Sequence, residues 1–243
     1  MSRMARIENS DGVKWPPLIS GTLISRYKRF LADVRLESGE IITAHCPNSG
    51  AMTGCSEPGR KVFISFHDDP RRKLKYTWQL IDMPTSLVGV NTMIPNRLVA
   101  KSIKRRLIPD LLGYDNIFSE VKVGSNSRID LLLQNDEKDR CYVEVKNCTL
   151  VKNGQALFPD AVTTRGKKHL VELQGLVTRG YRCVMFYLIQ RMDAQKFSPA
   201  DEIDPGYGKE LRKAVSDGVE MLVYDVLINN EHIKIHRKLP CNL

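Results

Sequence analysis

Long apolar runs are missing from this chain of 243 residues, and so is any closely spaced pair of cysteines. Because a bilayer-spanning helix needs roughly 20 apolar residues, no membrane span is expected. Polar residues such as Glu8 and Asn9 stand where a secretory signal would be apolar, which predicts a cytoplasmic protein. Zinc ribbons and fingers use C-x-x-C pairs, so reduced thiols are the expected state of the cysteines. A zinc site at His45, Cys46 and Cys55 would lack a fourth ligand.

Acidic residues are scarcer than basic ones. The chain has 28 Asp and Glu against 37 Lys and Arg, which gives a net charge of +9. A basic surface indicates an anionic partner, and nucleic acid is the commonest such partner of a soluble protein. Charge alone identifies no site, so it serves here as support for a site found by other means.

The chain divides into two parts with different sequence patterns, and neither part contains a repeat or a low-complexity segment. The first third has short segments of strand character between Gly, Pro, Asn and Asp turn signals. Five such strands in about 80 residues predict a small barrel of the OB-fold type, whose open face binds single-stranded nucleic acid. We assign this barrel to residues 1–83 and place the break between domains in 83–91. The expected strands are 22–26, 31–37, 41–46, 61–66 and 75–81.

From about residue 95 onward, segments with helical periodicity alternate with segments typical of strands. This alternation predicts an α/β domain over residues 84–243, with a mixed central sheet covered by helices. One helix is expected around Val99, Ile103 and Leu107, and the one over 164–178 is expected to be capped by Thr163 or Thr164. Another helix is expected at 207–216, and strands at 117–123, 128–133, 141–149, 183–190 and 221–227.

The second domain contains a predicted cluster of carboxylates beside one lysine. Side chains alternate along a strand, so Glu144 and Lys146 share one face. If a hairpin turns at Ser125, Glu120 lies opposite Asp130, with the two side chains about 5 Å apart on the same face. Three carboxylates near one amine are costly unless a cation neutralises them, and such hard oxygen ligands suit Mg²⁺ or Mn²⁺.

This set of groups points to phosphodiester hydrolysis. A metal held by Glu120, Asp130 and Glu144 could polarise a phosphodiester and lower the pKa of a bound water. Lys146 would orient that water or stabilise charge that develops on phosphorus. The order Asp130, then Glu144-x-Lys146, resembles the PD-(D/E)XK nuclease motif, with Asp130, Glu144 and Lys146 as catalytic residues. An ordinary strand pair with exposed acids and a cross-strand ion pair is the competing interpretation.

Basic residues at two places are candidates for nucleic-acid contact. The first place interleaves cations with aromatic residues, as single-strand platforms do, although a strand with Phe30 in the barrel core explains it as well. The second is the helix after the carboxylates, where His169 is either a surface residue or a candidate general base. The run 101–106 is interpreted as the solvated side of a helix. The assigned nucleic-acid residues are Arg26, Tyr27, Lys28, Arg29, Arg128, Arg165 and Lys168.

Five motifs occur in order along the chain: GTLISRYKRFLADV at 21–34, HCPNSG at 45–50, NSRID at 126–130, YVEVKN at 142–147 and FPDAVTTRG at 158–166. Together they resemble the sugar fermentation stimulation protein A family, over roughly residues 20–225. The resemblance implies an N-terminal OB-fold, a PD-(D/E)XK nuclease-like domain and DNA binding. It also implies that Asp130, Glu144 and Lys146 are motif residues, with Glu120 as an additional acid. Members of this family are described chiefly as DNA-binding regulators with an inferred nuclease activity.

Two functions therefore compete. The first is a DNA-binding protein with a phosphodiesterase site that uses Mg²⁺ or Mn²⁺. The second is a non-cleaving, DNA-binding regulator of sugar-metabolism genes, in which the acidic cluster is a relic or a structural metal site. An enzyme acting on RNA is a third hypothesis. The oligomeric state is not fixed by the sequence, and a homodimer is one of the states open to it.

Overall fold

The N-terminal part of the chain folds into a closed barrel, as a computed structural model shows for residues 11–123, 127–137 and 139–243. Its strands pair in the order β4-β3-β2-β5-β6-β7, and a parallel pairing between β4 and β6 closes five of them into the barrel. This order and closure are those of an OB-fold. The strands are β2 (Leu18–Tyr27), β3 (Leu31–Leu36), β4 (Ile41–His45), β5 (Lys61–Phe66), β6 (Tyr76–Met83) and β7 (Ser86–Gly89).

Alternating apolar residues produce the barrel because successive side chains of a strand point to opposite faces. Ala32 and Val34 of β3 point inward and are fully buried, and they pack with Trp78 of β6. All five predicted strands are present. The sequence pattern missed β7, which is four residues long and forms a hairpin with β6.

The C-terminal part is built on a seven-stranded mixed sheet in the order β1-β16-β15-β13-β10-β9-β8. The three central strands β10, β13 and β15 run parallel, and the other pairings are antiparallel. A small sheet, β11-β12-β14, lies beside it. The large sheet consists of β1 (Val13–Lys14), β8 (Asn116–Val123), β9 (Ser127–Gln134), β10 (Arg140–Cys148), β13 (Arg182–Ile189), β15 (Glu220–Ile228) and β16 (His232–Lys238); the small one of β11 (Leu150–Lys152), β12 (Gln155–Phe158) and β14 (Lys196–Pro199).

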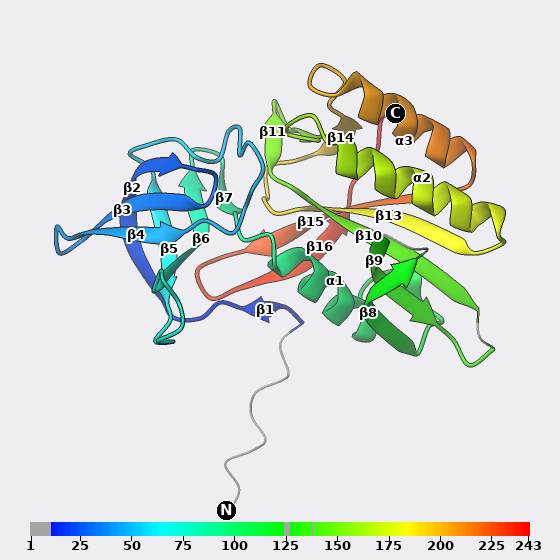
Figure 1. Cartoon of the computed structure of the whole chain (residues 1–243), viewed down its shortest axis with the longest axis horizontal. Helices are drawn as coiled ribbons and strands as arrows, with labels where there is room; N and C mark the ends of the chain where they lie inside the picture. The colour runs from blue at the N-terminus through cyan, green and yellow to red at the C-terminus, as the bar shows by residue number, and fades with distance from the viewer. Residues whose placement is uncertain (1–10, 124–126, 138) are drawn as a thin grey trace, which may run out of the picture.

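Helices cover both faces of the large sheet, as Figure 1 shows. Helix α1 (Ile94–Lys104) packs on one face, while α2 (Thr164–Thr178) and α3 (Pro205–Ser216) pack on the other. Because both faces are covered, the central strand β13 is apolar at almost every position, as expected for buried parallel strands. A short 3₁₀ helix, Pro109–Leu111, follows α1. The mixed sheet and its helices confirm the predicted α/β organisation, and among the described residues no helix is both long and apolar enough to cross a membrane.

The barrel and the sheet share one hydrophobic core. Phe63 and Leu80 of the barrel pack in the same cluster as Leu98 of α1 and Val184 of β13. The backbone N–H of Gly89, at the end of β7, donates to the carbonyl oxygen of Gln190 at 2.9 Å. The predicted division between residues 83 and 84 lies in the turn that joins β6 to β7, and it stays a prediction.

Candidate active site

Three carboxylate-bearing positions form one row across neighbouring strands. Ser119 pairs with Leu131 and Val121 pairs with Ile129, so Glu120 stands opposite Asp130 in the register of β8 and β9. The β9–β10 register ends at Val143 with Leu131, and extending it by one position brings Glu144 next to Asp130. The predicted hairpin register is thereby confirmed, although its turn, 124–126, lies outside the described residues.

Asp130 sits where β9 and β10 part. Their last backbone pair is Val143 with Leu131. At the next position the side chain of Asp130, not its backbone carbonyl, bonds to β10. Its Oδ2 accepts a hydrogen bond from the Val145 backbone N–H at 2.8 Å, and its Oδ1 accepts one from Asn96 Nδ2 at 2.8 Å. Its own backbone N–H lies 3.4 Å from Glu144 Oε2. The carboxylate therefore joins both strands and the first turn of α1.

Glu144 is the most enclosed member of the site, with 2% of its surface exposed. Lys146 Nζ donates to Glu144 Oε1 at 2.6 Å, which confirms that the two side chains share a face. His169 of α2 contacts the same oxygen through Nδ1, and Arg165 Nε lies 3.4 Å from His169 Nε2. His169 Nδ1 also lies 3.1 Å from Lys146 Nζ, so Glu144, Lys146 and His169 are in mutual contact.

The two carboxylates have opposite electrostatic tendencies. Burial, together with the negative charge of Glu144, raises the pKa of the Asp130 carboxyl from 3.8 to about 6. Burial alone would raise the pKa of Glu144 as well, but the hydrogen bond from His169 and the charge of Lys146 outweigh it and lower that pKa. Glu144 is thus held ionised, while the negative charge of Asp130 is poorly compensated. A cation would relieve this imbalance, and two carboxylates are a donor set that fits Mg²⁺ or Mn²⁺.

The predicted cluster of three carboxylates does not form around Glu120. The backbone of Glu120 has a positive φ of 55°, which interrupts the alternation of side chains along β8, and the residue is exposed. In the part of the chain that the structure describes, no group of three or more His, Cys, Asp or Glu side chains is arranged to hold a metal ion. The structure therefore brings together Asp130, Glu144 and Lys146, and adds Asn96 and His169 to them.

Neither Asn96 nor the burial of His169 followed from the sequence. Asn96 lies 34 residues before Asp130 and carries no local motif. His169 was a candidate because it follows Arg165 by one turn of helix, but its enclosure, with 6% of its surface exposed, depends on how α2 packs against the sheet.

The predicted phosphate contacts on α2 and β9 lie near the same end of the sheet. Arg128, Arg165 and Lys168 are all exposed. Arg165 contacts His169, and Lys168 Nζ lies 3.7 Å from Glu172 Oε1. Of these cations, Arg165 contacts the site, through His169.

The other predicted contacts occupy the β2–β3 hairpin, whose turn residues Lys28 and Arg29 have φ angles of 49° and 63°. Tyr27 and Phe30 flank this turn with 36% and 51% of their surface exposed, so Phe30 is not a core residue. The Arg26 guanidinium donates to the carbonyl oxygens of residues 29, 48, 50 and 51 at 2.8 to 3.3 Å. Arg26 thus holds the loop after β4, whereas the hairpin tip is open to solvent.

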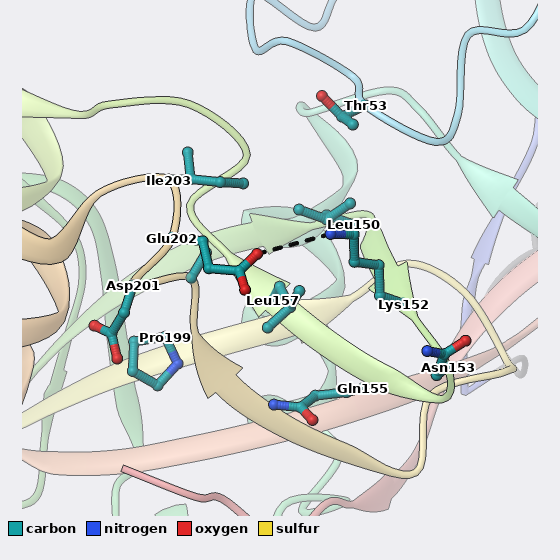
Figure 2. A pocket seen from close by; sticks show the side chains of 11 residues that line it. Thr53, Leu150, Lys152, Asn153, Gln155, Leu157, Pro199, Asp201, Glu202 and Ile203 are labelled. Atoms are coloured by element: carbon teal, nitrogen blue, oxygen red, sulfur yellow. Dashed lines mark ion pairs between the residues drawn. The ribbon is translucent and has the colours of Figure 1, made fainter.

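A separate hollow of about 410 Å³ lies beside the small sheet, and Figure 2 shows its lining. Leu150, Leu157 and Ile203 supply apolar surface. The charge of Lys152 is offset by Glu202, whose Oε2 lies 3.8 Å from Lys152 Nζ. This hollow therefore has neither the uncompensated charge nor the converging donors found around Asp130.

Comparison with known proteins identifies the family. Residues 93–232 match the model described as the sugar fermentation stimulation protein RE domain, and residues 24–90 match the SfsA N-terminal OB domain. The sugar fermentation stimulation protein homologue of Geobacter sulfurreducens is 54% identical over 224 residues, which cover 92% of this chain and 96% of that one. The Nitrosococcus oceani homologue is 51% identical over 229 residues, covering 93% and 97%.

A solved structure gives the same result. The structure of Pyrococcus furiosus SfsA in complex with Ca²⁺ superposes with a TM-score of 0.87 at 25% identity, and the match covers 95% of this chain and 98% of that one. Fold, motifs and relatives agree over nearly the whole length of the chain, which therefore belongs to the sugar fermentation stimulation protein family.

Proposed function

We propose that this protein binds DNA and hydrolyses its phosphodiester bonds with the help of Mg²⁺ or Mn²⁺. The observation that carries the proposal is the convergence of two carboxylates and one amine where β9 and β10 part: Asp130, Glu144 and Lys146. The Pyrococcus furiosus relative was solved with Ca²⁺, a cation that takes oxygen ligands. The OB-type barrel and the net charge of +9 support an elongated polyanion as the partner.

Each residue of the site has a separate task in this proposal. Asp130 and Glu144 would hold the cation, which supplies polarisation of the phosphodiester and a bound water of lowered pKa. Mg²⁺ commonly uses only one or two protein carboxylates and takes its other ligands from water and phosphate, so Glu120 is not required. His169 contacts Glu144 Oε1 through its Nδ1 and would keep that carboxylate oriented.

Lys146 is the residue of the site best placed to meet the reacting phosphate. Its Nζ is held by Glu144 Oε1 at 2.6 Å and lies 3.1 Å from His169 Nδ1, while 12% of the side chain remains exposed. An ammonium in that position can orient the attacking water or stabilise the charge that develops on phosphorus.

A cleavage assay tests the proposal. Purified protein would be incubated with single-stranded, duplex and branched DNA in Mg²⁺ or Mn²⁺, with EDTA as the blank. Lys146→Ala is expected to lose cleavage by at least about 100-fold while it keeps DNA binding. Lys152→Ala, which removes an exposed lysine beside the other hollow, is the matched control and should cleave like the wild type. If the wild type cleaves none of these substrates with either metal, the nuclease proposal fails.

One observation favours the second function, a DNA-binding regulator that does not cleave. Glu120 is exposed, and among the described residues no set of three acidic, histidine or cysteine side chains is arranged for a metal. A regulator of this kind would bind DNA without turnover in either metal. Competition between DNA and RNA of the same sequence would show which of the two nucleic acids the protein prefers.

A further inference from the structure

A groove with a basic lining runs between α1 and β8, outside the site described above. Its volume is about 660 Å³. Four of the seven lining residues are cationic and none is acidic or aromatic. The lining residues are Arg97, Ala100, Lys101, Lys104, Arg105, Ile117 and Ser119.

Three cations form a row along this groove because of their helical spacing, and we call this row the track. Arg97, Lys101 and Lys104 follow one another at intervals of four and three residues, so they stand on one face of α1. Buried residues such as Leu98 hold the opposite face of the helix against the sheet. With a rise of 1.5 Å per residue, the track is about 10 Å long. At about 3.4 Å per nucleotide along one strand, that length matches about three phosphates.

The charge of the track is poorly compensated from within the protein. Among residues 11–123, 127–137 and 139–243, neither Arg97 nor Lys104 has an ion-pair partner, and both are exposed. Lys101 donates to the backbone carbonyl of Gly12 at 2.8 Å, which fixes the amine without neutralising it. By contrast, Arg182 on β13 of the same sheet is paired with Glu220 at 2.7 Å. Like charges held together in this way favour an anion from outside.

The track begins at the candidate active site. Asn96, the residue before Arg97, donates to Asp130 Oδ1. Ser119, which lines the groove, directly precedes Glu120, the residue opposite Asp130 in the strand register. Helix α1 lies next to β8 and β9 in Figure 1, on the side of the sheet away from α2 and α3. A strand laid along the groove would therefore reach Asp130 at one end.

We propose that this groove binds the sugar-phosphate backbone of a DNA strand, with Arg97, Lys101 and Lys104 each contacting a phosphate. The cations would contact phosphates, which carry no sequence information, so the contacts are independent of sequence. The inference rests on the proposed function in one respect, that the bound strand leads to the candidate active site. Binding in the groove does not itself require cleavage.

DNA binding of a charge-neutralised groove tests the inference. The variant carries Arg97→Gln, Lys101→Gln and Lys104→Gln, and its affinity for labelled 20-nucleotide single-stranded and duplex DNA is measured by fluorescence anisotropy in EDTA. Three lost phosphate contacts should raise Kd about 10- to 100-fold at ~0.1 M salt and reduce the slope of log K against log salt by about 2 to 3.

A matched control removes the same charge elsewhere. The variant with Arg179→Gln, Lys196→Gln and Lys209→Gln loses one arginine and two lysines, all exposed and located on or beside α2 and α3. It should bind within about twofold of the wild type. A groove variant that keeps its charges, with Arg97→Lys, Lys101→Arg and Lys104→Arg, should also bind like the wild type, because phosphate contact depends on charge.

Equal losses in the groove and control variants would overturn the inference, and so would an unchanged salt slope. If urea unfolding shows that the triple groove variant is misfolded, the single variant Lys104→Gln serves as the test. Its affinity for DNA should fall about threefold or more, and its slope of log K against log salt should change by about 1. The two proposals fail separately. A wild type that binds through the groove but never cleaves ends only the nuclease proposal, and a groove variant that binds and cleaves normally ends only this one.

Discussion

Replacing Asp130 by asparagine should make the protein more stable at neutral pH, although it removes a proposed ligand of the metal. The pKa of Asp130 is raised from 3.8 to about 6, first by burial and then by Glu144. For an acid whose pKa is raised on folding, the native state binds the proton more tightly than the unfolded state does. Stability therefore falls as the pH rises from about 4 to about 6, and the full penalty persists above that range.

The magnitude follows from the size of the shift. One pKa unit corresponds to about 1.4 kcal/mol, so ionised Asp130 destabilises the native state by about 3 kcal/mol at pH 7.5. An amide oxygen can still accept the N–H of Val145, but the hydrogen bond from Asn96 is lost, at about 1 kcal/mol. Asp130→Asn should thus raise the free energy of unfolding by about 2 kcal/mol at pH 7.5 and by clearly less at pH 5.

Urea unfolding in EDTA at pH 5 and 7.5 measures this difference, and the fluorescence of the buried Trp15 and Trp78 reports it. Asp136→Asn, in the exposed loop after β9, is the control and should leave stability unchanged. Mn²⁺ at about 100 times its Kd should stabilise the wild type by about 2.7 kcal/mol and Asp130→Asn far less. A variant no more stable than the wild type at pH 7.5 would refute the reasoning from burial and charge.

Three further outcomes test the surroundings of the site. His169→Ala should lower the free energy of unfolding by about 1 to 3 kcal/mol, because the buried Glu144 loses a donor; thermal melting measures this, and an unchanged melting temperature would contradict it. Arg26→Met should lower the free energy of unfolding by about 2 to 4 kcal/mol, because several carbonyl oxygens lose their donor. An unchanged free energy in urea unfolding would show that the loop after β4 is stable without Arg26. Phe30→Ala should change stability by less than about 0.5 kcal/mol yet weaken single-stranded DNA binding by about 1 to 3 kcal/mol; full retention of binding would remove the hairpin tip from the DNA interface.

Local patterns were enough for the elements that carry the site. The helix expected at 164–178 is α2, and Thr163, one of the two predicted caps, accepts a hydrogen bond from the Gly166 N–H at 3.0 Å. These features follow from neighbouring residues, because a cap or a period involves only one or two turns of chain. The short strands β1, β7, β11, β12 and β14 were missed for the same reason, and β16, which is seven residues long, was missed as well. Strands of two to four residues are too brief for a period, and each exists only because a partner lies beside it.

The residues of the candidate site divide in the same way between local and long-range causes. A spacing of two residues on a strand was sufficient to place Glu144 beside Lys146, and the length of the hairpin was sufficient to bring Glu120 into line with Asp130. The positive φ of Glu120 could not be foreseen, since it departs from the alternation on which the prediction of a shared face depended.

Sequence by itself therefore determined the two-part fold, the motif residues Asp130, Glu144 and Lys146, and the row in which the acids stand. Only the tertiary structure decided that Asn96 and His169 complete the site and that Asp130 is the carboxylate with the raised pKa. The physical reason is the distance along the chain over which each effect acts. Strand alternation acts between neighbours, whereas burial and charge at the site depend on α1 and α2 packing against opposite faces of one sheet.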